Sequence, residues 1–221
     1  DHSGAGEPMN TIVALDLDGP NPDGGVVLCS GADFYSTPEL SATGRLAWTQ
    51  WNHPNMPWDS TTIMTGTMVG TMIIDSHAVA GALDESAVQP RWLNDKLIFA
   101  SDRTNWWNLY LWSKDGVQPL CVTDAEFCPP QWNFGQRSYA IIDNDHLLAT
   151  LNRSGEQSIE ILTISDGTLS PLADLGTTAT SLDVGGRHAA ALLNYPDRPA
   201  TVALYDLDQH AWTKVRSAIE T

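Results

Sequence analysis

The sequence is poor in basic residues, and this shortage argues against several classes of partner. It contains 11 Lys and Arg against 27 Asp and Glu, for a formal net charge of −16. Binding to a nucleic-acid backbone needs a basic face, and docking on anionic lipid needs basic clusters. We therefore predict no nucleic-acid partner and no membrane association, and we interpret the acid excess as a solvated surface.

Cysteine and long apolar runs are scarce as well. The three cysteines, Cys29, Cys121 and Cys128, show no C-x-x-C spacing, so a zinc site or redox pair has no support. Free buried thiols are typical of a reducing compartment, which predicts a cytoplasmic location. No apolar run approaches the ~18 residues that span a bilayer. The start, DHSGAGEPMN, has no signal-peptide pattern.

Strand signals dominate what remains. Stretches rich in Val, Ile, Leu, Thr, Tyr and Trp alternate with Gly, Asp, Asn and Pro. No segment of ten or more residues has a clean apolar period of about 3.6, so helices should be scarce and the fold all-β. The predicted strands lie within residues 11–19, 25–30, 45–51, 61–68, 71–76, 96–101, 108–113, 117–122, 138–143, 146–152, 158–165, 188–194, 201–207 and 211–215.

The strands recur in a repeating order. Each unit begins with a short strand and a polar turn, continues with an apolar strand and a polar loop, and ends with two further strands. The units lie at residues 38–51, 90–120, 130–173 and 180–215, and the positions taken as equivalent are Pro38, Pro90, Pro130 and Ser181. Their spacings are 52, 40 and 51 residues. Four strands per unit at this period are typical of β-propeller blades, and a β-sandwich is the minority alternative.

The count of blades does not close a ring. Residues 11–30 resemble the outer two strands of a blade that begins before residue 1, so about four and a half blades are present. We expect residues 1–221 to form a single partial β-propeller domain, part of a seven-bladed ring. An open ring would leave unpaired blade edges, through which the chain could also form a homo-oligomer.

Four stretches then point to a family: SGADFYSTPELSATGRLAWTQWNHPNMPWD (30–59), SAVQPRW (86–92), FASDRTNWWNLY (99–110) and DAEFCPPQWNFGQRSYA (124–140). With these motifs the chain resembles the N-terminal β-propeller of the prolyl oligopeptidase family of serine peptidases, in its acylaminoacyl-peptidase-like or dipeptidyl-aminopeptidase-like branch. The family's Ser-Pro-Asp-Gly turn is replaced by SATG (41–44) and LND (93–95).

The resemblance implies partners outside this sequence. In the family, the propeller caps a C-terminal α/β-hydrolase domain with a Ser-Asp-His triad, and the substrates are peptides. That domain needs a G-x-S-x-G nucleophile elbow, which these residues lack; GTMVG (66–70) has Met at its centre. We therefore predict that the catalytic domain is absent from this chain, that none of its residues is catalytic, and that alone it is inactive.

The run NHPNMPWDS, after Trp51, is the first candidate site. Two prolines restrict its backbone, and its polar side chains could contact the hydrolase domain or a substrate: His53, Asn55 and Asp59. One interpretation is that Trp51, Met56 and Trp58 only pack over the blade. The resemblance favours a rigid element at the domain interface or substrate entrance. The corresponding connection of the next blade carries Trp106 and Trp107.

Arg103 and the acidic clusters complete the candidates. Arg103 could bind a peptide carboxylate, although Ser-Asp-Arg more often forms a structural corner in which Asp102 accepts backbone hydrogen bonds. DLDGPNPDG (16–24) and DNDH (143–146) do not fit a calcium loop, and we predict turns. The six histidines form neither H-E-x-x-H nor H-x-H, so we predict no metal and no cofactor.

The hypothesis from the sequence is a non-catalytic propeller that gates access of peptides to a hydrolase domain. The alternative is a free-standing, TolB-like propeller that acts as a protein-interaction scaffold. A weaker alternative is an independent hydrolase with a site on the propeller face. Glycosidase chemistry is a remote form of it, because that chemistry needs two facing carboxylates and the sequence cannot place such a pair.

Overall fold

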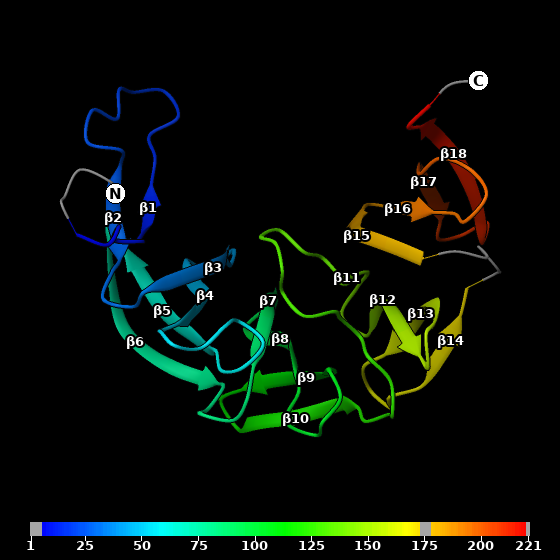
Figure 1. Ribbon diagram of the computed structural model, residues 1–221, viewed down its shortest axis with the longest axis horizontal. Helices are drawn as coiled ribbons and strands as arrows, with labels where there is room; N and C mark the ends of the chain where they lie inside the picture. Colours follow the sequence, from blue (N-terminus) through cyan, green and yellow to red (C-terminus); the bar gives the residue numbers. More distant parts are fainter. Residues whose placement is uncertain (1–5, 173–177, 220–221) are drawn as a thin grey trace. The chain divides into compact units, whose positions relative to one another are not determined.

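The computed structural model describes residues 6–172 and 178–219 (Figure 1). These residues contain no helix, and hence none that could cross a membrane. A short hairpin comes first, formed by β1 (Ile12–Ala14) and β2 (Val26–Cys29). All-β was the predicted class, and the described residues confirm it.

Four four-stranded sheets follow the hairpin, and we number them in chain order. The first comprises β3 (Phe34–Leu40), β4 (Arg45–Trp51), β5 (Thr62–Val69) and β6 (Met72–Ala80). The second comprises β7 (Ala87–Leu93), β8 (Lys96–Ser101), β9 (Asn108–Ser113) and β10 (Gly116–Cys121). The third comprises β11 (Tyr139–Ile141), β12 (His146–Arg153), β13 (Glu156–Thr163) and β14 (Leu169–Pro171). The fourth comprises β15 (Thr178–Gly185), β16 (His188–Asn194), β17 (Thr201–Asp206) and β18 (Ala211–Ser217).

Within every sheet the strands lie side by side in chain order, and the pairs whose register is recorded are antiparallel (Figure 1). This meander of four strands is the blade that the sequence repeat predicted. The second strands begin at residues 45, 96, 146 and 188, so the repeat measured on the structure is 51, 50 and 42 residues. Together with the hairpin, the sheets give the four blades and a half that we expected.

The predicted ranges omitted four strands: β14, and the first strands of three sheets, β3, β7 and β15. β3, β7 and β15 mix polar residues with proline or glycine, and each is interrupted by a register shift. The residue at the shift has a positive φ in all three strands: 48° at Thr37, 56° at Gln89 and 57° at Ser181. An extra residue of this kind is a β-bulge, which breaks the alternation of side chains that predicts a strand.

The bulge explains the proline signal and corrects part of the alignment. Pro38 and Pro90 directly follow the positive-φ residue. At these two positions the strand is unpaired, so the absence of a backbone N–H in proline breaks no hydrogen bond of the sheet. Ser181 therefore corresponds to Thr37 and Gln89, one position earlier than we had aligned it. Pro130 was wrongly taken as equivalent: it lies in a loop nine residues before β11 begins.

The acidic stretches form turns, as predicted. The N–H of Asp16 donates to Oδ1 of Asn21, whose Nδ2 donates back to the Asp16 carbonyl. In the DNDH stretch, Oδ1 of Asp143 accepts the N–H groups of Asp145 and His146. Slight burial opposes ionisation of Asp143, but these N–H donors and the His146 ring outweigh it and lower the pKa of Asp143.

The chain divides into two compact units, and the division runs through the second sheet. Unit 1 comprises Asp1–Arg103 and Leu111–Val117, and unit 2 comprises Thr104–Tyr110 and Gln118–Thr221. In unit 1, Ile12 and Cys29 of the hairpin pack with Leu46 and Trp48 of the first sheet. The hairpin and the first sheet thus cover each other's apolar residues within unit 1.

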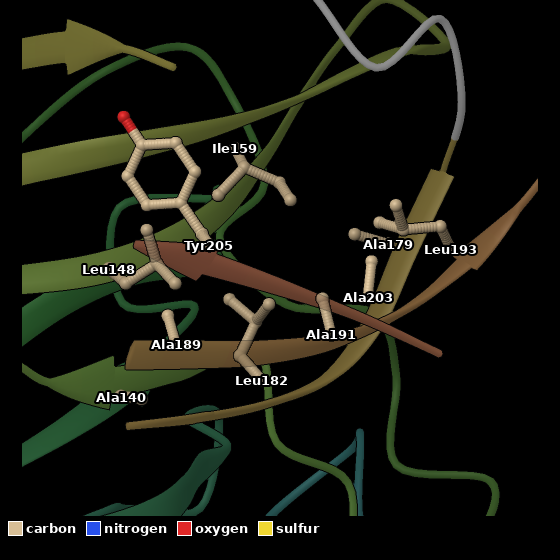
Figure 2. Packing of buried hydrophobic residues seen from close by; sticks show 10 residues of the cluster. All are labelled: Ala140, Leu148, Ile159, Ala179, Leu182, Ala189, Ala191, Leu193, Ala203 and Tyr205. Atoms are coloured by element: carbon tan, nitrogen blue, oxygen red, sulfur yellow. The ribbon is translucent and has the colours of Figure 1, made fainter. Parts of the chain in front are cut away.

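In unit 2, the third and fourth sheets share one apolar cluster. Small residues of β16 and β17 (Ala189, Ala191, Ala203) allow close approach of Leu148 and Ile159 from the third sheet. Figure 2 shows Tyr205 beside Leu148 and Ile159 at one end of the cluster, and Ala179, Leu193 and Ala203 at the other.

Candidate functional site: the loop edge of the first two sheets

All eight predicted site residues lie at one kind of edge. In a four-stranded antiparallel meander, the connection between the second and third strands emerges at the same end as the connection that leaves the fourth strand. We call this end the loop edge. Trp51 ends β4, and the other seven lie in the connections that follow β4 and β8: His53, Asn55, Trp58, Asp59, Arg103, Trp106 and Trp107.

Trp51 anchors the first loop, which we define as residues 52–61. Its side chain is buried and stacks on the ring of Phe34, with 5.3 Å between centroids. The ring of Phe34 in turn meets the imidazole of His53 edge-on at 4.9 Å. An aromatic stack of this kind fixes the beginning of the loop. Trp51 therefore packs within the blade, which was one of the two interpretations offered by the sequence.

His53 lines a cavity of about 530 Å³. Its Nε2 lies 3.0 Å from Oε1 of Glu7, and its backbone N–H donates to Oδ2 of Asp33. Glu7, Asp33 and Phe34 line the same cavity. The pocket thus combines two carboxylates, an imidazole and an aromatic ring, a set suited to polar contacts with a peptide.

A tight turn shapes the middle of the first loop. Oδ2 of Asp59 accepts the N–H of Met56, and the N–H of Asp59 donates to the Met56 carbonyl. The N–H of Asn55 donates to the carbonyl of Asn52. These local bonds explain why Asp59 and Asn55 occur at their positions. The side chain of Met56 remains exposed, and Trp58 is partly buried.

Two buried hydroxyls fasten the first loop to the connection that leaves β6. Oγ1 of Thr61 donates to the carbonyl of Ala87 and accepts its N–H, at 2.8 and 2.7 Å. Oγ of Ser86, which is fully buried, donates to the carbonyl of Pro57. Gly81 allows this contact, because a Cβ at its position would overlap the Thr61 carbonyl. The loop is therefore long but fixed at both ends.

Arg103 sits in the corner that its Ser-Asp-Arg sequence suggested. Oδ1 of Asp102 accepts the N–H of Ser86, which is the backbone hydrogen bond predicted for Asp102. Partial burial is the main cause that raises the pKa of Asp102, whereas the Ser86 N–H opposes the rise. Arg103 pairs with Oε1 of Glu85 at 2.6 Å, and the Arg103 side chain keeps 30% of its surface exposed.

Trp106 and Trp107 belong to the second loop, residues 104–107, in unit 2. Trp107 is buried; its N–H donates to Oε2 of Glu126 and its carbonyl accepts the N–H of Phe127. Trp106 is partly buried, and its carbonyl accepts the N–H of Asn108. Of the pair, Trp106 is the one with surface available for contacts.

Asn108 is the residue that fastens the second loop. It is fully buried, its Nδ2 donates to the carbonyl of Thr123, and its Oδ1 accepts the Thr123 N–H. The sequence analysis missed Asn108, as it missed Thr61 and Ser86. The sequence pattern that could have indicated Asn108 is a polar residue at the start of a strand, directly after an aromatic loop.

The third sheet presents a further aromatic pair at its loop edge. Trp132 and Phe134 lie before β11 and are 70% and 72% exposed. Large apolar side chains that remain exposed in a connection are typical of contact surfaces.

Within the described residues, no serine or cysteine side chain is hydrogen-bonded to a histidine ring. Among the five described histidines, side-chain partners are carboxylates, a backbone carbonyl or a tyrosine hydroxyl. Within the same residues, no group of three or more His, Cys, Asp or Glu could hold a metal ion.

Comparisons with known proteins find similar solved structures. A puromycin-hydrolysing peptidase of Mycobacterium tuberculosis matches with a TM-score of 0.81 and 29% identity, over 88% of this chain and 31% of that one. Prolyl oligopeptidase B of Galerina marginata matches with a TM-score of 0.73 and 12% identity, over 98% and 31%. TolB of Acinetobacter baumannii matches with 0.59 and 15%, over 87% and 45%. No family model and no curated protein matches the chain.

These matches support conclusions of different scope. At 12% and 15% identity, the second and third show the fold alone. The match to the puromycin-hydrolysing peptidase is closer in both sequence and structure, and this chain spans about a third of its length. The structure therefore confirms the resemblance that the sequence motifs predicted, to the N-terminal β-propeller of the prolyl oligopeptidase family of serine peptidases.

Proposed function

We propose that this chain is the propeller part of a serine peptidase, and that it gates the access of peptides to a hydrolase domain encoded outside these 221 residues. The observation that carries the proposal is the 29% identity with a puromycin-hydrolysing peptidase over 88% of the chain. The chain itself is then non-catalytic, and the complete protein cleaves peptides. Three free cysteines, Cys29, Cys121 and Cys128, support a reducing, cytoplasmic setting.

In this proposal the loop edge of the first two sheets faces the hydrolase domain. The first loop is fixed at its start by Trp51 and at its end by Thr61, so it presents Met56 and His53 on a rigid support. A rigid rim excludes substrates by size because widening it would break buried hydrogen bonds. The exposed part of Arg103 and the surface of Trp106 would contact the partner domain or the substrate.

The first experiment concerns the complete protein. We would express the full reading frame that contains this chain and treat it with a fluorophosphonate probe, which labels activated serines. We expect a labelled serine outside residues 1–221, and hydrolysis of aminoacyl and short peptidyl p-nitroanilides. A complete reading frame without a labelled serine would overturn the proposal.

The gating part is tested with a matched pair of methionines in the complete protein. Met56 lies at the loop edge of the first sheet, and Met72 lies at the opposite end; their exposed fractions are 47% and 63%. We expect Met56→Ala to change the ratio of kcat/KM for long and short peptides about threefold or more, because it alters the rim. Met72→Ala should leave that ratio unchanged. Equal effects of the two substitutions would contradict gating at the loop edge.

A TolB-like interaction scaffold is the second candidate, and the structural likeness to TolB is the observation that favours it. The scaffold would be encoded without any hydrolase domain. The same reading frame decides between the two, because only the peptidase requires a G-x-S-x-G elbow downstream.

A further inference from the structure

The fourth sheet contains a cavity that none of the predicted site residues lines. It has a volume of about 760 Å³ and lies at the loop edge, between the connection that follows β16 and the end of β18. Its lining includes Leu193, Tyr195, Arg198, Ala203, Trp212 and Lys214. Figure 2 shows Leu193 and Ala203 at the end of the apolar cluster, so the cavity continues from the core of unit 2.

One side of the cavity is apolar because of strand register. In antiparallel pairs, directly opposed residues share a face of the sheet. Ala203 opposes Lys214, and Tyr205 opposes Trp212, whose ring lies 5.1 Å from that of Tyr205. The stem of Lys214 therefore emerges beside Ala203 and Trp212, and its ammonium group can reach the mouth of the cavity.

The second cation is held by an aromatic ring. The guanidinium carbon of Arg198 lies 4.0 Å from the ring centroid of Tyr195, a cation–π contact that fixes the guanidinium while leaving its edge available for hydrogen bonds. The carboxylate of Asp197 is 3.8 Å away, and both side chains are more than half exposed, so this ion pair is weak.

No other ion pair occupies these two cations. In the described part of the chain, Arg198 has no carboxylate partner besides Asp197, and Lys214 has none. The cavity lining thus holds two cations and one carboxylate, Asp197, which pairs only weakly with Arg198. This excess of positive charge beside an apolar wall favours a ligand that is anionic at one end and apolar at the other.

The charge of the surrounding region supports an anionic ligand. Residues 178–219 contain four basic and four acidic residues, whereas the whole chain has 11 basic and 27 acidic. An anion that approaches the fourth sheet therefore meets far less repulsion than elsewhere on this chain. The two cations of the cavity are half of the basic residues in that region.

We propose that this cavity binds the free C-terminal residue of a short peptide, with its carboxylate on Arg198 and Lys214 and its apolar side chain against Leu193, Ala203 and Trp212. The inference rests on the proposed function, because it specifies the peptides that such a peptidase would retain. It adds a requirement for a free carboxylate and an apolar C-terminal residue.

Isothermal titration of the 221-residue chain at low salt tests the site without any catalysis. The probes are N-acetyl-phenylalanine and its amide, which differ only in the negative charge. We expect the acid to bind at least tenfold more tightly. Arg198→Gln and Lys214→Gln should each weaken binding of the acid at least fivefold and leave the amide unaffected.

Arg216→Gln is the matched control, because it removes one positive charge from β18 at a residue that pairs with Val202 and does not line the cavity. It should change binding less than twofold. Equal affinity for acid and amide, or an effect of Arg216→Gln as large as that of Lys214→Gln, would overturn the site. Benzoate that binds as tightly as N-acetyl-phenylalanine would overturn the assignment to a peptide end.

The outcomes separate this inference from the proposed function. Selective binding of the acid, combined with a complete protein that carries no reactive serine, would leave the site standing and remove the peptidase. An active peptidase whose propeller does not prefer the acid would do the reverse.

Discussion

The first and second loops occupy the same place in their own sheets, and different residue types fasten them. In both, the residue that precedes or begins the third strand exchanges two hydrogen bonds with the backbone of a residue beyond the fourth strand. Thr61 does so with Ala87, and Asn108 does so with Thr123. A hydroxyl and an amide share one property: each can donate and accept at once.

The comparison identifies what the position requires. The first loop has ten residues and needs additional support from Ser86 and from the aromatic stack on Trp51. The second loop has four residues, and Asn108 also binds the carbonyl of Trp106 within the loop itself. The position therefore selects hydrogen-bonding capacity, and the length of the loop decides how many other residues must assist. The predictions below address this rule, beginning with the largest effect.

Asn108→Leu should destabilise unit 2 by about 2 kcal/mol, because it keeps the volume but leaves the partly buried N–H and carbonyl of Thr123 without these partners. Urea denaturation followed by tryptophan fluorescence measures the change. Asn133→Leu, at an exposed position, is the control and should cost less than about 0.5 kcal/mol. A loss equal to that of the control would mean that Asn108 does not fasten the loop.

Thr61→Val should destabilise unit 1 by about 2 kcal/mol, since it removes only the hydroxyl that bonds both groups of Ala87. Thr61→Ser retains the hydroxyl and loses one methyl group, so it should cost about 1 kcal/mol or less. The same urea titrations give both values. If serine and valine were equally destabilising, packing rather than hydrogen bonding would explain the position.

Glu85→Gln should cost about 1 kcal/mol. Glu85 accepts from Arg103 and from the hydroxyl of Ser101, and both side chains of the ion pair retain some solvent contact, which limits its strength. The loss should shrink in 1 M NaCl, where an ion pair is screened. A salt-independent loss would assign the effect to the hydrogen bonds alone.

Asp102→Asn should produce the smallest change, visible as a dependence on pH. Burial raises the pKa of Asp102 in the folded chain above its ordinary value of 3.8. An acid of this kind favours the folded state below pH 3.8, and that contribution is lost as the pH rises through the folded pKa. The stability of the variant relative to the original chain should therefore improve from pH 3.5 to pH 7, measured by urea midpoints. A relative loss over that range would contradict the assigned direction.

The sequence predicted the repeat because turn residues and apolar strands recur at nearly constant spacing. It missed β14 and three first strands, and in those three a bulge with a positive φ at Thr37, Gln89 and Ser181 interrupts the alternation of side chains. It also misplaced one repeat, because Pro130 lies in a loop and not at a bulge. Proline alone does not distinguish these two settings.

The candidate site shows the same division. Local bonding can be read from neighbouring residues, so the turn formed by Asp59 with Met56 was within reach. The Ser-Asp-Arg motif suggested that Asp102 accepts a backbone hydrogen bond, but the donor, Ser86, lies 16 residues away. Thr61 and Ala87 are 26 residues apart, and Arg198 and Lys214 are 16 apart. Such residues come to the same place only through the packing of the sheets and their connections, which a single sequence does not display.

By itself, then, the sequence determined the all-β class, the four-stranded repeat and the resemblance to a peptidase propeller, because each depends on residues close together in the chain. Tertiary structure decided which tryptophans are buried, which polar groups fasten the loops and where Arg198 and Lys214 line one cavity. Those outcomes depend on burial and on hydrogen bonds between residues far apart in the chain. Such interactions stabilise the protein only after the sheets have packed.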